Sequence, residues 1–137
     1  RPFMHVITFD ILENDISDIP TLISIADCIT LHIPKTDENN AFMDKDKLAM
    51  MKNDAVLINT SRGEIVDELA LYTALKNGEL AGAGLDVFEQ EPYSGLFTGL
   101  ENVVLTPHIG SYAKEVRVQM EIEAAQNLIK GLLIEEK

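Results

Sequence analysis

The sequence predicts an α/β fold in which helices cover both faces of one parallel sheet, an arrangement called a doubly wound sheet. Short β-rich apolar runs alternate with segments of helical periodicity, and each helical segment is long enough to cross over a sheet. The runs expected as strands are 5–9, 29–33, 55–59, 81–87 and 103–105. The expected helices are 19–26, 44–51, 68–77 and 112–134.

The limits of these elements follow from residues that start or stop regular structure. Ser17 or Asp18 can cap the first helix and Asp67 the third, because a short polar side chain accepts hydrogen bonds from exposed amides. Pro34 stops the second strand, since it has no amide to donate to a neighbour. Gly78 lies where a helix usually ends in a left-handed residue.

Apolar patterning indicates which elements are buried. The 55–59 run is apolar up to its last residue, which is typical of a strand covered on both faces. The last helix carries one apolar stripe, formed by Val116, Met120, Ala124, Leu128 and Leu132. Residues 89–101 form the longest irregular stretch and are expected as a surface loop.

Composition excludes some classes of function. The 137 residues fit one domain, and 11 basic against 23 acidic residues give a net charge of −12. Such a surface does not favour binding to nucleic acid or to an anionic membrane. An anionic substrate would therefore need a local positive group.

Cysteine usage and hydropathy point to a cytoplasmic protein. The single cysteine, Cys28, cannot form an internal disulfide and opens an apolar run, so we expect it in the core of a protein from a reducing compartment. No apolar run approaches the length that spans a bilayer, and no signal peptide is visible. The chain begins at Arg1, which suggests a piece of a longer protein.

Three polar side chains follow three predicted strands. Arg62 comes after the 55–59 run, Glu91 after 81–87 and His108 after 103–105. Ligands of open parallel sheets bind at the carboxyl ends of the strands. A guanidinium, a carboxylate and an imidazole at that edge would form an acid–base site for an anionic substrate.

Each of these residues also has a simpler interpretation. A lone histidine after a strand is more often structural, and this holds for His108 and outright for His5 and His32. Glu91 could be a solvated loop charge, and Asp10 could be an ordinary turn residue or an acceptor for a ribose.

Two further kinds of site are rejected. The Gly82-Ala83-Gly84 run lacks a third glycine and opens no helix, so it is not a phosphate-binding loop. No cluster of histidine, cysteine and acidic residues has the spacing of metal ligands, and we expect no metal.

Taken together, the motifs resemble the NAD-dependent D-isomer-specific 2-hydroxyacid dehydrogenases over nearly the whole chain. The segments that carry the resemblance are Leu31-His32-Ile33-Pro34 with Thr36, Leu57 to Gly63 with Val66-Asp67, Leu75 to Gly78 with Leu80 to Ala83, Asp86 to Glu89 with Glu91-Pro92, and Thr106 to Gly110. The resemblance implies a Rossmann-type fold and an oxidoreductase acting on a small 2-hydroxy or 2-keto acid.

The resemblance also implies the catalytic roles. Arg62 would hold the carboxylate and carbonyl of the substrate with its fork of donors. His108 would protonate the carbonyl oxygen as hydride arrives and act as the base in reverse. Glu91 would pair with His108 and keep it protonated.

The same resemblance implies contacts with NAD. Asp10 would bind the adenosine ribose and favour NAD over NADP, and Asp86 would hold the nicotinamide carboxamide. The other implied positions at the cofactor cleft are His32, Pro34, Thr60, Ser61, Arg62, His108 and Gly110.

Within the family, the sequence after His108 is more similar to the branch that acts on phosphoglycerate or on glycerate and hydroxypyruvate. Phosphoglycerate dehydrogenases act in serine biosynthesis. The resemblance also implies a homodimeric enzyme. A non-enzymatic, NAD-sensing corepressor built on the same fold remains an alternative, as does an inactive fragment.

Two departures from the family pattern indicate truncation. The glycine fingerprint with its first βα unit and the substrate domain are both absent, so residues 1–137 are expected to form part of an NAD-binding domain. The missing βα unit would supply the central strand of the sheet. The predicted strands at 5–9 and 55–59 would therefore each lose a neighbour. We therefore expect a rearranged or intermolecularly paired sheet that binds no NAD.

Overall fold

One parallel sheet organises the protein. The computed structural model describes residues 4–10 and 18–134. The strands of these residues are β1 (Cys28–Leu31), β2 (Val56–Asn59), β3 (Gly82–Leu85) and β4 (Val103–Leu105), and they pair in the order β1-β2-β3-β4. The predicted parallel α/β fold of Rossmann type is confirmed.

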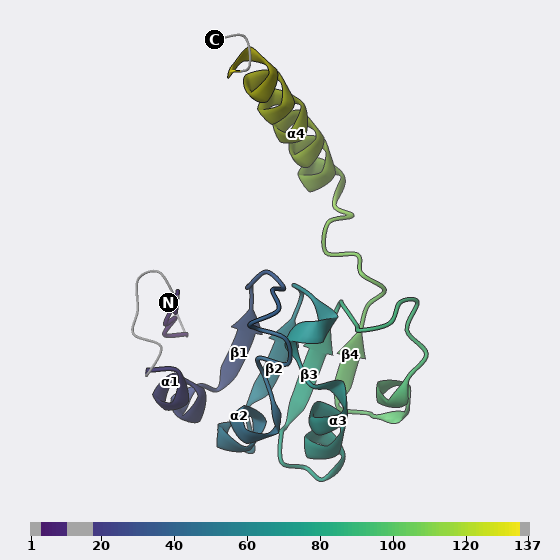
Figure 1. The fold of residues 1–137 in the computed structure, drawn as a ribbon. Coiled ribbons are helices and arrows are strands. Elements are labelled where there is room, and N and C mark those ends of the chain that lie inside the picture. Colours follow the sequence, from purple (N-terminus) through teal and green to yellow (C-terminus); the bar gives the residue numbers. More distant parts are fainter. Residues whose placement is uncertain (1–3, 11–17, 135–137) are drawn as a thin grey trace.

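Helices alternate with the strands along the chain (Figure 1). The α-helices are α1 (Ile19–Ile25), α2 (Lys45–Met50), α3 (Glu68–Lys76) and α4 (Lys114–Ile134). Two short 3₁₀ helices, η2 (Gly63–Ile65) and η3 (Leu96–Gly99), lie in the connections. Each expected helix is present, with ends that differ by at most two residues.

Local signals act as predicted at both ends of α3 but not at the start of α1. The Asp67 side chain accepts a hydrogen bond from the Ala70 amide at 2.9 Å and caps α3. Gly78 follows the end of α3 with φ 71°, the left-handed conformation that glycine adopts without steric cost. Asp18 makes no such cap bond to α1, and the alternative cap, Ser17, lies outside the described residues.

The core lies between the sheet and the layer formed by α1, α2 and α3. Leu57, Ile65 and Leu71 are fully buried there. Along β2 the burial alternates, because Leu57 and Asn59 are buried while Val56 and Ile58 are only half-buried. The expectation that 55–59 is covered on both faces is therefore wrong for the part of the chain that the structure describes.

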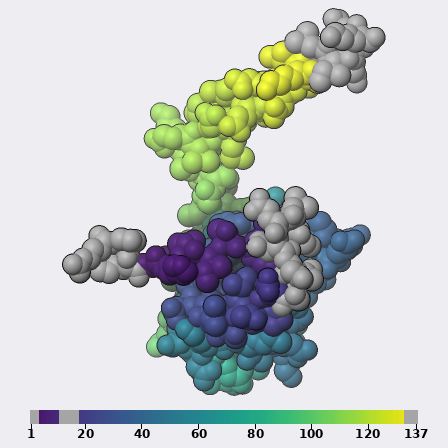
Figure 2. All heavy atoms as spheres, turned by 90° about the vertical axis from the view of Figure 1, so that its left-hand side faces the viewer, coloured from purple at the N-terminus to yellow at the C-terminus, as the bar shows by residue number. Residues whose placement is uncertain are grey.

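Helix α4 extends away from the sheet (Figures 1 and 2). Its predicted apolar stripe is exposed, and Met120, Leu128 and Leu132 each expose more than half of their surface. The helix forms from its local sequence, but no described element covers this stripe.

The predicted first strand is wrong. Residues 4–10 carry no regular secondary structure and lie on the surface at the β1 side of the molecule (Figure 2). Strand β2 pairs with β1 and with β3, so the predicted gap beside 55–59 and the rearranged sheet are not seen.

The edge strands of the described sheet are β1 and β4. Cys28 is exposed in β1, which corrects its expected place in the core. Whether a second copy of the chain pairs with β1 stays a prediction. In the part of the chain that the structure describes, no helix is both long and apolar enough to span a membrane.

Candidate active site

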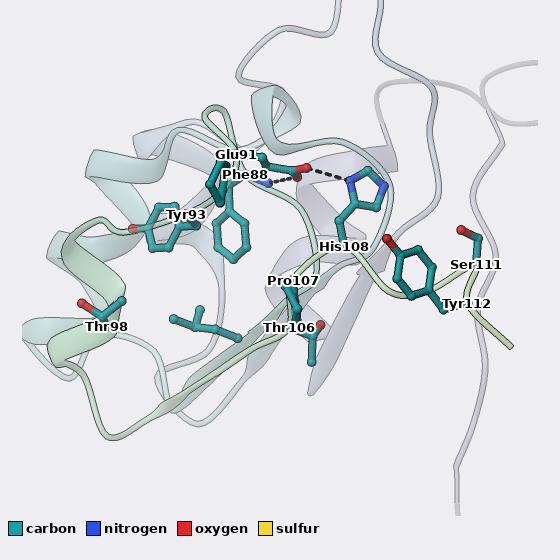
Figure 3. Close-up of a pocket in the computed structure, with 11 residues that line it drawn as sticks. Phe88, Glu91, Tyr93, Thr98, Thr106, Pro107, His108, Ser111 and Tyr112 are labelled. Atoms are coloured by element: carbon teal, nitrogen blue, oxygen red, sulfur yellow. Dashed lines mark hydrogen bonds and ion pairs between the residues drawn. The ribbon is translucent and has the colours of Figure 1, made fainter.

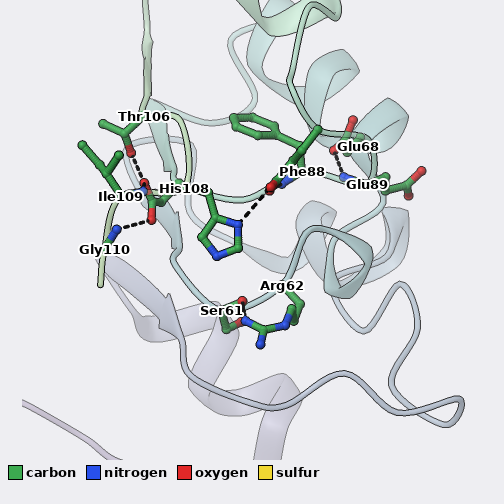
Figure 4. Close-up of polar contacts among 11 residues, drawn as sticks. Ser61, Arg62, Glu68, Phe88, Glu89, Thr106, His108, Ile109 and Gly110 are labelled. Atoms are coloured by element: carbon green, nitrogen blue, oxygen red, sulfur yellow. Dashed lines mark hydrogen bonds and ion pairs between the residues drawn. The ribbon is translucent and has the colours of Figure 1, made fainter. Parts of the chain in front are cut away.

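Three loops lie at the carboxyl edge of the sheet, one after each of three neighbouring strands. Residues 60–62 follow β2, 86–91 follow β3 and 106–110 follow β4. Because these strands lie next to one another, the side chains of Arg62, His108 and their neighbours gather in one region (Figure 4). The three segments therefore meet at one edge of the sheet, while a single site formed by all three side chains stays a prediction.

Asn59 fixes the loop that carries Arg62. Its side chain is buried, with 1% exposed. Its amide nitrogen donates to the Arg62 carbonyl at 2.8 Å, and its Oδ1 accepts from the Ser61 amide and hydroxyl, both at 3.1 Å. The loop is thus held by one buried side chain, while Arg62 itself remains exposed.

Gly63 brings this loop against the segment after β3. A Cβ atom at Gly63 would lie 2.0 Å from the carbonyl carbon of Phe88 and 2.4 Å from the amide nitrogen of Glu89. Only glycine permits this approach, since backbone atoms cannot yield as a flexible side chain can. The backbone next to Arg62 therefore packs directly on the backbone that leads to Glu91.

Glu91 and His108 form a hydrogen-bonded pair, which is an ion pair when the imidazole is protonated. The His108 Nδ1 lies 2.9 Å from Glu91 Oε2, and Glu91 Oε1 accepts from the Phe88 amide at 3.1 Å. The His108 bond, assisted by the Phe88 amide, holds the pKa of Glu91 below its usual value. Glu91 is therefore ionised at neutral pH, and Nε2 is the ring nitrogen left to meet a ligand.

Asp86 lies under the loop that carries His108. Its carboxylate is 5% exposed and accepts hydrogen bonds from the Thr106 hydroxyl, the Ile109 amide at 2.9 Å and the Gly110 amide at 2.8 Å. Burial by itself raises the pKa of Asp86, but these hydrogen bonds outweigh it and the pKa lies below the usual value. Asp86 is thus a buried, ionised anchor.

A pocket of about 760 Å³ opens beside the ion pair (Figure 3). Glu91 and His108 lie on its wall, and the stacked rings of Phe88 and Tyr93 form an apolar side, with centroids 4.1 Å apart. The pocket therefore combines an acid–base pair with apolar surface.

A second pocket of about 410 Å³ lies at the ends of β1 and β2. Its lining consists of His32, Ile33, Pro34, Lys35, Ser61 and Arg62. Ile33 and Pro34 offer apolar surface and Arg62 carries positive charge, while the Lys35 ammonium is paired with the Glu64 carboxylate at 3.1 Å. This donor set fits a nicotinamide nucleotide, which has flat apolar rings and an anionic pyrophosphate.

The remaining predicted positions are distributed around this edge. Thr60 is exposed beside Ser61, and His32 is exposed after β1 with Nε2 2.9 Å from the Thr30 hydroxyl. Asp10 is exposed in the segment 4–10, which is not a strand, so the placement on which its ribose contact depended is not observed. The ligand contacts of all these residues stay predictions.

Sequence analysis missed two residues that shape the site. Asn59 and Thr106 both support loops that carry predicted catalytic residues, yet neither was singled out. A polar residue at the end of an otherwise apolar strand was the available signal for Asn59. Thr106 gave the same signal, since it follows the apolar 103–105 run, but nothing local pointed to its distant partner Asp86. Among the described residues, no group of histidine, cysteine and acidic side chains could hold a metal ion.

Comparisons with known proteins point to one family. The family model described as D-isomer specific 2-hydroxyacid dehydrogenase, NAD binding domain, matches residues 4–110. A glyoxylate reductase of Thermococcus litoralis is 53% identical over 114 residues, which are 82% of this chain and 34% of that protein. A D-3-phosphoglycerate dehydrogenase of Synechocystis is 41% identical over 133 residues, which are 96% of this chain and 24% of that protein.

A solved structure shares the fold of this chain. An acyclic imino acid reductase in complex with NADPH and D-Arg superposes with a TM-score of 0.83 at 36% identity, over 90% of this chain and 42% of that one. This chain therefore spans about a third of the length of the first curated relative, and less than half of the superposed structure.

The close approach at Gly63 leads to a prediction about stability. In Gly63→Ala the added methyl group would overlap the Phe88 backbone, so we expect a loss of at least 1–3 kcal/mol, about the cost of overpacking a core. Gly99→Ala is the control, because a Cβ there meets nothing within 4 Å. Denaturant unfolding measures both, and equal stabilities for the two variants would contradict the contact.

Proposed function

The chain belongs to the D-isomer specific 2-hydroxyacid dehydrogenase family, as part of its NAD binding domain, and from this membership we propose that the whole protein is an oxidoreductase. Its reaction interconverts a small D-2-hydroxy acid and the 2-keto acid. The observation that carries the proposal is the His108–Glu91 pair at the carboxyl edge of the sheet, next to the loop of Arg62.

Each side chain of the site has a task that its chemistry suits. The exposed Arg62 guanidinium binds the carboxylate of the substrate and orients its carbonyl, because its donors match two oxygens at once. His108 delivers a proton from Nε2 to the carbonyl oxygen and takes it back in the oxidation direction. Glu91 accepts from Nδ1, which fixes the ring orientation and balances the charge of the imidazolium.

The bound nicotinamide cofactor supplies or accepts the hydride. The pocket at the ends of β1 and β2 would hold it, and Ile33 and Pro34 would supply apolar surface there. The other positions proposed to face it are His32, Thr60, Ser61, Arg62, Asp86, His108 and Gly110.

The substrate class is narrower in this proposal than the family alone requires. Glyoxylate and 3-phosphoglycerate appear in the names of relatives that are 53% and 41% identical. We propose a short, anionic acid of this kind, with glyoxylate, hydroxypyruvate and 3-phosphoglycerate as the compounds to assay. Cofactor binding without turnover of any 2-keto acid would instead favour a sensing role.

Loss of His108 gives the direct test of the reaction. In the full-length protein, His108→Ala is expected to lower turnover by roughly 10²–10⁴-fold, the scale of general acid–base catalysis. His5→Ala is the control, because His5 is exposed in the segment before α1. Steady-state kinetics with glyoxylate and reduced cofactor measure both, and near-normal turnover in His108→Ala would remove His108 from the mechanism.

The Glu91–His108 pair predicts a change in pH dependence. Reduction needs the protonated imidazole, and Glu91 is ionised at every relevant pH because its pKa is lowered. In Glu91→Gln the imidazolium loses its counter-ion, so the decline of reduction activity at high pH should move to lower pH.

Glu89→Gln is the matched control for that experiment. Glu89 is exposed, and its contact in this turn comes from its backbone amide, which donates to the Glu68 carboxylate at 2.8 Å. The measurement is kcat/KM for keto-acid reduction across the pH range. Identical profiles for the wild type and Glu91→Gln would leave Glu91 with a positioning role alone.

Asp10 leads to a prediction about cofactor choice. We propose NAD as the preferred cofactor, because the matching family model is that of an NAD binding domain and because the resemblance assigns Asp10 to the ribose, where its carboxylate would repel a 2′-phosphate. The full-length protein should then show a higher kcat/KM with NADH than with NADPH, and Asp10→Ala should narrow the difference. Asp54→Ala, an exposed site before β2, should leave it unchanged. Equal efficiency with both cofactors in the wild type would contradict this assignment.

A further inference from the structure

Three hydrogen bonds connect the loop from Thr106 to Gly110 to one carboxylate. Three donors on this loop, the Thr106 hydroxyl and the Ile109 and Gly110 amides, all point to Asp86 (Figure 4). They lie on both sides of His108 in sequence. His108 itself is anchored at its side chain, by Glu91, so the two acidic residues hold the loop from different sides.

The backbone of His108 needs such an anchor. Its φ is 54°, in the left-handed region that residues other than glycine rarely adopt. A residue in this region persists only where its surroundings hold it there, because relaxation to a negative φ lowers the energy. A change of φ at His108 would swing the imidazole away from Glu91.

Burial makes the anchor strong. Asp86 is 5% exposed, and water competes little for its oxygens. Hydrogen bonds to an ionised acceptor are roughly twice as strong as neutral ones. Gly110 is also part of the fit, since a Cβ there would lie 3.0 Å from Asp86 Oδ2.

We propose that Asp86 is a positioning residue whose buried carboxylate holds the 106–110 loop in the conformation that presents His108. The proposal rests on the role of His108 in the proposed function. It adds a task to Asp86 besides the expected contact with the nicotinamide carboxamide. Both tasks are compatible, because a carboxylate offers about four acceptor positions and three are used by the loop.

A substitution of Thr106 tests the two tasks of Asp86 separately. The Thr106 hydroxyl donates to Asp86 within the loop anchor, and no contact of Thr106 with the cofactor is expected. Thr106→Val removes one of the three hydrogen bonds with little change in shape, and Thr106→Ser restores it. Asp86→Ala removes all three. Thr73→Val is the matched control, since the Thr73 hydroxyl bonds to the Leu69 carbonyl within α3.

Two measurements on the full-length protein test the proposal. Without cofactor, hydrogen exchange followed by mass spectrometry should show the Ile109 and Gly110 amides exchanging about tenfold faster in Thr106→Val, the scale of one lost bond to a charged group. Asp86→Ala should exchange faster still, and Thr106→Ser and Thr73→Val should match the wild type. A peptide over 55–59 should keep its protection, which excludes global unfolding.

In steady-state kinetics, Thr106→Val should lower kcat several-fold with the KM for the cofactor unchanged, and Thr106→Ser should recover the wild-type kcat. Unchanged exchange in both Thr106→Val and Asp86→Ala would overturn the proposal, and so would a faster loop with normal kcat. A rise in the cofactor KM alone would assign Asp86 to the cofactor only. If the wild type reduces no 2-keto acid, the proposed function fails, and the exchange measurement still decides whether Asp86 holds the loop.

Discussion

Parallel pairing of β2, β3 and β4 in a fixed register is the constraint on which the site depends. Asn59 pairs with Leu85, and Leu85 pairs with Leu105, so the three strands end level with one another. The chain then leaves all three strands at the same edge. Residues that are far apart in sequence meet there, and a shift in register would separate the loop of Arg62 from those of Glu91 and His108.

Two buried polar side chains convert this shared edge into a defined geometry. Asn59 holds the loop of Arg62, and Asp86 holds the loop of His108. Both are nearly inaccessible to solvent, and within the described residues no buried side-chain polar atom lacks a partner. Rigid anchors below an exposed pair of reactive groups suit a site that must orient a small ligand, because the exposed groups have few contacts of their own.

Several apolar surfaces of the described residues are exposed to solvent. Residues of β1 form an edge, Val104 is 68% exposed and the stripe of α4 faces solvent. These surfaces explain the errors made from sequence. Cys28 was expected to be buried because its neighbours are apolar, but burial also requires a second element to cover it. The predicted strand at 5–9 failed for a related reason, since a β-rich segment becomes a strand only when a neighbour accepts its hydrogen bonds.

The sequence by itself determined the alternation of strands and helices, the cap at Asp67, the left-handed Gly78 and the three polar residues after strand ends. These features depend on local backbone preferences or on short periodic patterns, so they can be inferred without knowing the partners. Only the tertiary structure decided which strand forms the edge, which sheet face is covered, and how Asp86 and Thr106 support His108. Those outcomes depend on contacts between segments distant along the chain, and hydrogen bonds across 20 or more residues leave no local pattern in the sequence.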